Sequence, residues 1–424
     1  MIKSLIKNAN SKGFFHLLTA NYFIGFLGLA AQLIVVKFLS PVEMGQIKTL
    51  QSFIAVISII AGFGFNTAVL KICSEKIDLA TKRLIFSKNL IYTQVSITFV
   101  LILVYIFAKL EFFSQDKDIN EWLIIYLLIV PASVLTGLFM TYLQALKQIK
   151  LMATIQSIIR LVGVSAIILF THYYGFSGFV WTTITIAYIG LVGILIFIKD
   201  EIDFDLSYPL EKRNFTYASW SFLANMIGTG AMYLDIFILN SISEDRELFG
   251  FYSIATIFLL GLNYVTSTVQ SVSTPYFSEK SNQKQEFIRV LNKYLKILIM
   301  VSIFAGLAAF FIVPIIVSIF YGDTYKSVSE FFQILVFKYI FWSGSALMGV
   351  AVLSIGRMKF NFMVVVVTTI IAFFITYYFG LIYGVYGVAY GQVLSYFIAM
   401  IFILIVGRMV INNHFKGLEL KNGI

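Results

Sequence analysis

The stretch from Asn214 to Ser243 contains a single formal charge, Asp235, in thirty otherwise uncharged residues. About 20 apolar residues cross the hydrocarbon of a bilayer as a helix, so this stretch predicts a membrane span. An acid facing lipid would cost about 2.5–3.5 kcal/mol. The residues that precede Asp235 at helical spacing are Ser221, Asn225, Gly228 and Met232. We therefore expect one polar face that includes Asp235 and is turned towards other helices or water.

The composition is that of an integral membrane protein. Of 424 residues, 59% are hydrophobic and 12% are charged, and the mean hydropathy is +0.90. Soluble domains carry about 25% charged residues. Uncharged runs separated by charged breaks predict an all-α protein with about twelve transmembrane helices, near 14–39, 45–70, 88–109, 122–146, 151–173, 176–198, 215–241, 248–276, 295–321, 328–354, 361–381 and 385–407.

Short matches recur in the same order at offsets of 204 to 209 residues. Asn21 returns as Asn225, and Tyr174–Gly178 returns as Tyr383–Gly387. The chain is therefore predicted to be a duplicated six-helix unit, with an N-terminal lobe at 1–199, a cytoplasmic linker at 200–213 and a C-terminal lobe at 214–424. Because six is even, both halves enter the membrane from the same side. The two repeats are therefore parallel and are related by an axis along the membrane normal.

The basic residues report orientation. Most of the 31 Lys and Arg residues lie in connections on one side of the predicted spans, and cytoplasmic connections are the ones enriched in Lys and Arg. Both termini are therefore predicted to be cytoplasmic. The net charge of +10 is explained by these basic residues in the cytoplasmic connections. Nucleic acid is therefore not an expected partner.

Several kinds of chemistry are excluded by the residues available. Cys73 is the single cysteine, and the three histidines lie far apart without metal-ligand spacing, so neither a metal site nor a cofactor is predicted. No GxxxxGK[ST] phosphate loop occurs, so we expect no nucleotide hydrolysis by this chain. Its connections are too short for the catalytic segment of a polymerase or glycosyltransferase, and we do not expect an enzyme.

Four short motifs resemble signatures of Wzx-type polysaccharide repeat-unit flippases, the exporters of O-antigen and capsule units. They lie at Leu39–Gly45, Gly250–Tyr252, Phe320–Tyr325 and Ile355–Lys359. The first resembles an LGPxxYG signature, from which Ser40 and Met44 depart. The resemblance spans the chain and implies the fold of the multidrug/oligosaccharidyl-lipid/polysaccharide (MOP) exporter superfamily, which is also the fold of MATE transporters. In that fold two lobes enclose a central cavity.

Two charged residues inside the spans are candidates for coupling and binding. Asp235 is expected to act as a titratable gate or coupling group, or else to form a structural ion pair. Lys338 lies about 15 Å into its predicted span at 1.5 Å per residue. It is expected to attract an anionic cargo or to pair with Asp235. The two roles of Lys338 do not exclude one another.

Four further residues are candidate cavity contacts. Arg160 either grips phosphate bidentately or snorkels to the inner headgroups. Lys48 is a cavity residue or an interfacial anchor. Asn21 and Asn225 occupy matching places in the two halves and either bind sugar hydroxyls or bridge helices.

The resemblance implies a flippase that moves a polyprenyl-diphosphate-linked oligosaccharide from the cytoplasmic to the periplasmic leaflet of a bacterial inner membrane. A polysaccharide polymerase and a chain-length regulator are implied as candidate partners. The alternative is an ion-coupled multidrug or cation antiporter of the same superfamily. Cations outnumber acids inside the predicted spans, which favours an anionic cargo.

Overall fold

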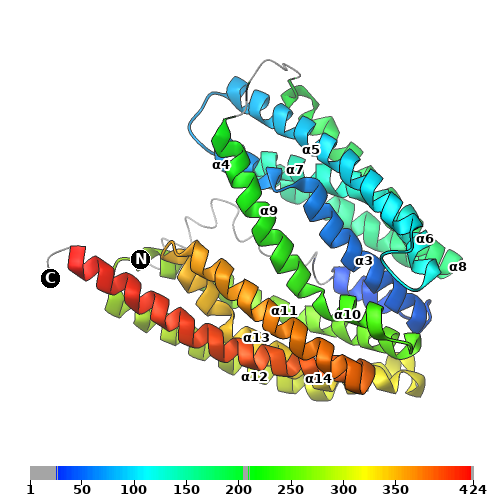
Figure 1. Cartoon of the computed structure of the whole chain (residues 1–424). Helices are drawn as coiled ribbons and strands as arrows, with labels where there is room; N and C mark the ends of the chain where they lie inside the picture. The colour runs from blue at the N-terminus through cyan, green and yellow to red at the C-terminus, as the bar shows by residue number, and fades with distance from the viewer. Residues whose placement is uncertain (1–24, 26, 204–208, 210, 422–424) are drawn as a thin grey trace. The chain divides into compact units, whose positions relative to one another are not determined.

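The computed structural model describes residues 25, 27–203, 209 and 211–421. In this part of the chain every regular element is helical, and no strand occurs. In chain order the labelled elements begin with α3 (Pro41–Gly62), α4 (Phe65–Cys73), α5 (Leu79–Lys109), α6 (Lys117–Tyr126), α7 (Ile129–Ala145), α8 (Ile149–Ile198), the 3₁₀ turn η1 (Lys199–Glu201) and α9 (Lys212–Met232). It is followed by α10 (Leu234–Ile242), α11 (Arg246–Glu279), α12 (Lys284–Tyr321), the 3₁₀ turn η2 (Asp323–Tyr325), α13 (Lys326–Ser354) and α14 (Met358–Lys421) (Figure 1).

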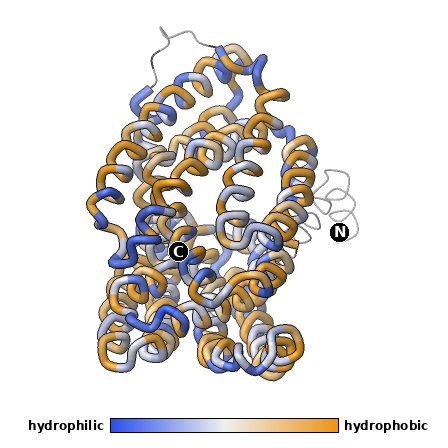
Figure 2. Tube along the Cα trace, turned by 90° about the vertical axis from the view of Figure 1, so that its right-hand side faces the viewer, coloured by the Kyte–Doolittle hydropathy of each residue, from blue (hydrophilic) through white to orange (hydrophobic). Residues whose placement is uncertain are grey.

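Eleven of the twelve predicted spans have a helical counterpart. Nine spans result when each of two bent helix pairs is taken as one. Two of these nine, α8 and α14, each divide into two at a glycine with non-helical backbone. The twelfth predicted span, 14–39, is helical at residues 25 and 27–35, and its residues 14–24 and 26 lie outside the described part of the chain. Hydrophobic residues run along most of the helices, and hydrophilic ones gather at several helix ends and connections (Figure 2).

The apolar surface is the surface expected of helices in lipid. On α12 the side chains of Phe304 and Ile319 are 77% and 73% exposed, and the same helix has the highest mean hydropathy of the candidate spans. Exposed phenylalanine and isoleucine at this density would be an aggregation hazard in water. In a membrane these apolar side chains contact the acyl chains of the lipids, which are equally apolar.

Three predicted spans are broken rather than continuous. In 45–70 the break is at Phe63 and Gly64, which both have positive φ. In 122–146 the chain bends by 44° between α6 and α7. Pro131 lies just after that bend, where its ring excludes a regular helix at Leu127, four residues earlier. In 215–241 the bend is 56°, between Met232 and Leu234.

The predicted duplication is visible in the backbone. Gly175 has φ 59° and ψ −140°, and Gly384, 209 residues later, has φ 59° and ψ −138°. Three residues after each, Gly178 and Gly387 lie against the carbonyls of Phe170 and Phe379, so a Cβ at either position would overlap a carbonyl oxygen. The repeat therefore preserves a break and a close helix–helix contact that only glycine allows.

A second repeated device ends the helices α7 and α13. Lys147 and Gly356, again 209 residues apart, have φ of 61° and 75°. In both cases the next amide donates to a carbonyl five residues before it, Gln148 to Leu143 and Arg357 to Val352. This is the Schellman pattern that closes helices with a left-handed residue.

The described chain forms two compact units, one extending to Gly230 and the other beginning at Ala231. In the first, α7 packs against α4 and α8, and α3 packs against α5. In the second, α13 is central and packs against α11, α12 and α14. The lobe boundaries at 199 and 214 follow from the sequence repeat, a different criterion, and they stay a prediction.

The repeated glycines give a stability prediction. Gly387→Ala is expected to lower the free energy of unfolding by about 1–3 kcal/mol, because overpacking at a fixed carbonyl forces a backbone shift. Gly193 lies in α8, and a Cβ added there would meet nothing within 4 Å. Gly193→Ala should therefore leave stability unchanged or raise it by up to about 1 kcal/mol. Thermal unfolding of the purified protein in detergent measures both. Equal midpoints for the two variants would contradict the close contact.

Candidate functional site

Asp235 lies in the first turn of α10 and is 3% exposed. Its Oδ2 accepts a hydrogen bond from the hydroxyl of Tyr252 at 2.6 Å and from Nζ of Lys338 at 3.0 Å. Its Oδ1 accepts from the amide of Ile236 at 3.0 Å. Three donors, one of them a full positive charge, therefore compensate the buried carboxylate.

The ion pair joins four helices of the second unit. Asp235 comes from α10, Tyr252 from α11 and Lys338 from α13. The Lys338 ammonium also lies 5.1 Å from the ring centroid of Tyr396 in α14, a cation–π contact. The carboxylate at the start of α10 is further favoured by the positive end of the helix dipole. The predicted pairing of Asp235 with Lys338 is thus present, and the binding roles expected of the two residues stay predictions.

The predicted polar stripe does not continue to Asp235. Ser221 and Asn225 lie on α9, whereas Asp235 lies beyond the 56° bend. Counting steps of three and four through the bend was therefore wrong, because the break at Tyr233 interrupts the helical register.

Arg160 lies on α8 and is exposed. Its guanidinium covers Gly28, at the position that a Cβ of residue 28 would occupy. Within the described chain, its side chain forms no hydrogen bond or ion pair with a carboxylate. The structure therefore leaves this cation available at a position inside a predicted span.

The remaining predicted contacts are placed as follows. Lys48 is half-buried in α3. Asn225 is exposed on α9 and donates to the hydroxyl of Ser221 at 3.1 Å, and Ser221 in turn lies 2.7 Å from the hydroxyl of Thr67. Asn21 lies outside the described residues. Lys48, Asn225 and Arg160 thus belong to the first unit, whereas the ion pair belongs to the second.

A cavity of about 390 Å³ lies within the first unit. Its wall is formed by α3, α7 and the residues beside the two helix breaks at Gly64 and Tyr126, with one residue each from α5 and α9. The residue from α9 is Asn225, so one of the predicted contacts does line a cavity. The other candidates that the structure describes do not line it.

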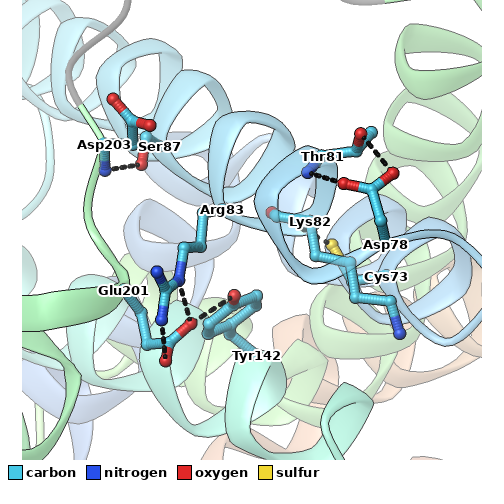
Figure 3. Close-up of polar contacts among 9 residues, drawn as sticks. All are labelled: Cys73, Asp78, Thr81, Lys82, Arg83, Ser87, Tyr142, Glu201 and Asp203. Carbon is cyan, nitrogen blue, oxygen red and sulfur yellow. Dashed lines mark hydrogen bonds and ion pairs between the residues drawn. The ribbon is translucent and has the colours of Figure 1, made fainter.

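A polar network that was not predicted from the sequence holds the beginning of the segment between α8 and α9. Glu201 accepts two hydrogen bonds from Arg83, at 2.9 and 3.0 Å, and a third from Tyr142 at 3.1 Å (Figure 3). Asp203 donates its amide to the hydroxyl of Ser87 at 2.7 Å. These partners are 59 to 118 residues apart, and no spacing in the sequence identifies them.

The other end of that segment is held by buried amides. Asn214 and Asn89 are 1% and 0% exposed and donate to each other at 2.9 and 3.1 Å. Nearby, Arg213 binds Glu75 at 2.9 Å. The start of α9 is therefore tied to α5 and to the connection between α4 and α5.

The connection between α4 and α5 begins α5 with a cap. Asp78 accepts hydrogen bonds from the amide and the hydroxyl of Thr81, both at 2.8 Å (Figure 3). These bonds to the charged form hold the pKa of Asp78 below its usual value. The cap therefore persists at neutral pH and weakens as the pH falls through that lowered pKa.

The fold is shared with solved membrane transporters. The chain superposes on lipid II flippase MurJ in its inward closed conformation with a TM-score of 0.76 and 16% identity, covering 96% of this chain and 91% of that one. It superposes on an inward-facing multidrug resistance MATE family transporter of the MOP superfamily with a TM-score of 0.73 and 15% identity, covering 93% and 96%. These matches confirm the predicted fold class, an all-α fold like that of MurJ and the MATE transporters.

The sequence identifies the family within that class. The family described as polysaccharide biosynthesis protein matches residues 34–330, which is well over half of the chain. The protein therefore belongs to the polysaccharide biosynthesis protein family, and the predicted resemblance to Wzx-type flippases is confirmed. None of the curated protein sequences matches it.

The ion pair gives a second prediction. Lys338→Met should lower the free energy of unfolding by about 3–5 kcal/mol, because it leaves Asp235 buried without its cation. Asp235→Asn combined with Lys338→Met should recover most of the loss, since the charge is removed together with its partner. Lys359→Met, at an exposed position, is the matched control and should shift stability by less than about 0.5 kcal/mol.

Denaturant or thermal unfolding of the wild type, Asp235→Asn, Lys338→Met and the double variant in the same detergent gives the double-mutant cycle, and Lys359→Met is measured beside them. A loss of less than about 1 kcal/mol for Lys338→Met would be the value of a solvated pair and would contradict burial of the ion pair.

Proposed function

We propose that this protein translocates polyprenyl-diphosphate-linked oligosaccharides, the repeat units of a surface polymer such as O-antigen or capsule, from the cytoplasmic to the periplasmic leaflet of a bacterial inner membrane. It works by alternating access, with both termini in the cytoplasm. The sugars and the diphosphate cannot cross hydrocarbon unaided, because each buried polar group costs several kcal/mol without a partner. The membership of the polysaccharide biosynthesis family supports this cargo.

The observation that carries the proposal is the balance of charge. Asp235 is neutralised by Lys338 at 3.0 Å and is 3% exposed. Arg160 is exposed on α8 and has no carboxylate partner in the described chain. A cation antiporter needs a carboxylate free to receive its cargo, whereas a diphosphate needs an unpaired cation. The arrangement fits the second requirement.

Arg160 is suited to a phosphate group by its chemistry. Its planar guanidinium offers paired N–H donors to two phosphate oxygens at once. Packing on Gly28 limits the side chain's freedom and lowers the entropy lost when the anion binds. We therefore assign Arg160 to the diphosphate, in preference to an anchor at the inner headgroups.

The Asp235–Lys338 pair is proposed as the gating element. Lys338 can pair with Asp235 or with an arriving anion, and the two choices compete for one ammonium. Tyr252 and the amide of Ile236 would keep the carboxylate partly compensated while Lys338 is engaged elsewhere. Lys48, Asn225 and Asn21 are proposed as neighbouring contacts to the head group.

The third prediction concerns Arg160. In a strain that lacks the gene, Arg160→Gln should reduce surface polymer at least about tenfold, the effect of a lost charge-assisted hydrogen bond of roughly 1.5–3 kcal/mol. Arg160→Lys should be intermediate because it keeps the charge but not the paired donors. Arg289→Gln, at an exposed position of α12, is the control and should support normal polymer.

The same strains separate the two candidate functions. A flippase restores polymer without changing susceptibility to cationic drugs, and an antiporter does the reverse. Complementation of strains whose own flippases have known sugar specificity then names the repeat unit. Normal polymer with both Asp235→Asn and Asp235→Ala would exclude the gating role.

A further inference from the structure

The cavity of the first unit has an uncharged polar wall. Its polar side chains are amides, hydroxyls and one phenol, contributed by Gln51, Ser58, Asn66, Thr93, Tyr126, Ser133 and Asn225. No Asp, Glu, Lys, Arg or His is among the described residues that line it. A cation or a phosphate placed there would lose its hydration without meeting an opposite charge. The wall therefore selects an uncharged polar ligand.

Thr93 shows that the wall has unused hydrogen-bonding capacity. It is 1% exposed, and its Oγ1 has no hydrogen-bond partner in the described structure. Thr98 of the same helix, by contrast, donates to the carbonyl of Gln94 at 3.0 Å. A buried hydroxyl without a hydrogen-bond partner is unfavourable, and Thr93 is among the residues that line the cavity.

Two more wall residues, which are half-buried, also lack a hydrogen-bond partner for their side chains. The side chains of Gln51 and Ser58 form no hydrogen bond within the described part of the chain. Asn225 uses its amide nitrogen on Ser221, and Asn66 uses its carbonyl oxygen on the amide of Thr67 at 2.9 Å. Each asparagine thus keeps one half of its amide for a ligand.

We propose that this cavity is a subsite for one uncharged sugar ring, in which the Thr93 hydroxyl and the amides of Gln51, Asn66 and Asn225 bind the ring hydroxyls. The inference rests on the proposed function and adds to it that two different sites bind two parts of the cargo. The diphosphate is bound at Arg160, and a neutral sugar of the repeat unit is bound in the cavity. The apolar part of the wall, including Ile54 and Val134, contacts the C–H face of the ring.

The size of the cavity agrees with this ligand. Its volume of about 390 Å³ falls in the ~300–1,000 Å³ range of small-molecule sites. A cavity of this volume has room for one pyranose ring. A complete oligosaccharide does not fit, so the subsite binds only one part of the cargo.

Gly137 allows the cavity to be filled without strain. It lies on α7 in the cavity wall, and a Cβ added there meets nothing within 4 Å. Gly137→Leu therefore places its side chain in the space that we assign to the sugar. Gly193 of α8 is equally open and is not part of the wall, so Gly193→Leu is the matched control.

Thr93→Val removes the orphan hydroxyl at nearly constant volume. Because that hydroxyl has no protein partner in the described chain, the change should leave the thermal midpoint unchanged or raise it, while it weakens sugar binding. Thr98→Val is its control, because the hydroxyl of Thr98 already donates a hydrogen bond to the carbonyl of Gln94. A loss of binding without a loss of stability is the outcome that a purely structural role would not give.

The experiment is saturation-transfer NMR on the full chain in lipid nanodiscs, with methyl glucoside and N-acetylglucosamine as neutral probes. Glucuronate is the anionic probe and tetraphenylphosphonium the cationic one. We expect a saturable signal from a neutral probe, abolished by Gly137→Leu and weakened by Thr93→Val about two- to tenfold, the range for one hydrogen bond. The two controls should bind as the wild type does.

Retention of the neutral-sugar signal by Gly137→Leu would overturn the subsite, and so would stronger binding of glucuronate or the phosphonium ion at this cavity. Polymer complementation distinguishes this failure from failure of the proposed function. If the wild-type chain restores polymer and Gly137→Leu restores it equally well, the subsite is wrong and the flippase stands. If the wild type restores none, the proposed function itself is wrong.

Discussion

Charge is the most expensive feature that this chain brings into the membrane, and the structure is organised by how each charge is compensated. Asp235 has the full set of partners: an ammonium, a phenol and a backbone amide. That arrangement fixes where α10, α11 and α13 meet, because each of them contributes one group. Arg160, by contrast, lies against Gly28 and has no carboxylate partner among the described residues. The contrast between a satisfied pair and an available cation is the physical basis of the proposed cargo.

Interrupted helices are the second organising feature. A continuous helix satisfies all its backbone groups internally, and lipid favours continuity for that reason. The chain departs from continuity at Gly64, Tyr126 to Leu128 and Tyr233, all next to polar side chains or the cavity. Breaks at these places are tolerated because neighbouring helices shield them. Gly64 shows the constraint directly: a Cβ there would overlap the carbonyl of Ala218 in α9.

The fold was largely predictable from the sequence, for reasons that particular residues make clear. Uncharged runs of about 20 residues locate spans by length alone, and the duplicated Tyr-Gly sequences correctly marked the breaks at Gly175 and Gly384. The breaks at Phe63 and Tyr233 were missed, because hydropathy does not change where backbone conformation does. The polar stripe was extended through Tyr233 for the same reason.

The site was less predictable. The pairing of Asp235 with Lys338 could be anticipated, because two opposite charges at similar depth in the membrane stabilise each other when they form an ion pair. The Arg83–Glu201–Tyr142 network and the cavity at Thr93 could not, since both depend on contacts between residues far apart in the chain. Thr93 is one of several buried hydroxyls that lack a partner in the described structure, and what distinguishes it is its place in the cavity wall.

The central claim is that the chain moves a lipid-linked oligosaccharide across the membrane, and the leaflet in which that lipid accumulates tests it most directly. Depletion of the protein should raise the level of polyprenyl-diphosphate-linked oligosaccharide, and membrane-impermeant oxidation of spheroplasts should leave that pool intact because its sugars still face the cytoplasm. If the pool stays at its normal level, or if its sugars are fully oxidised from outside, the claim is contradicted.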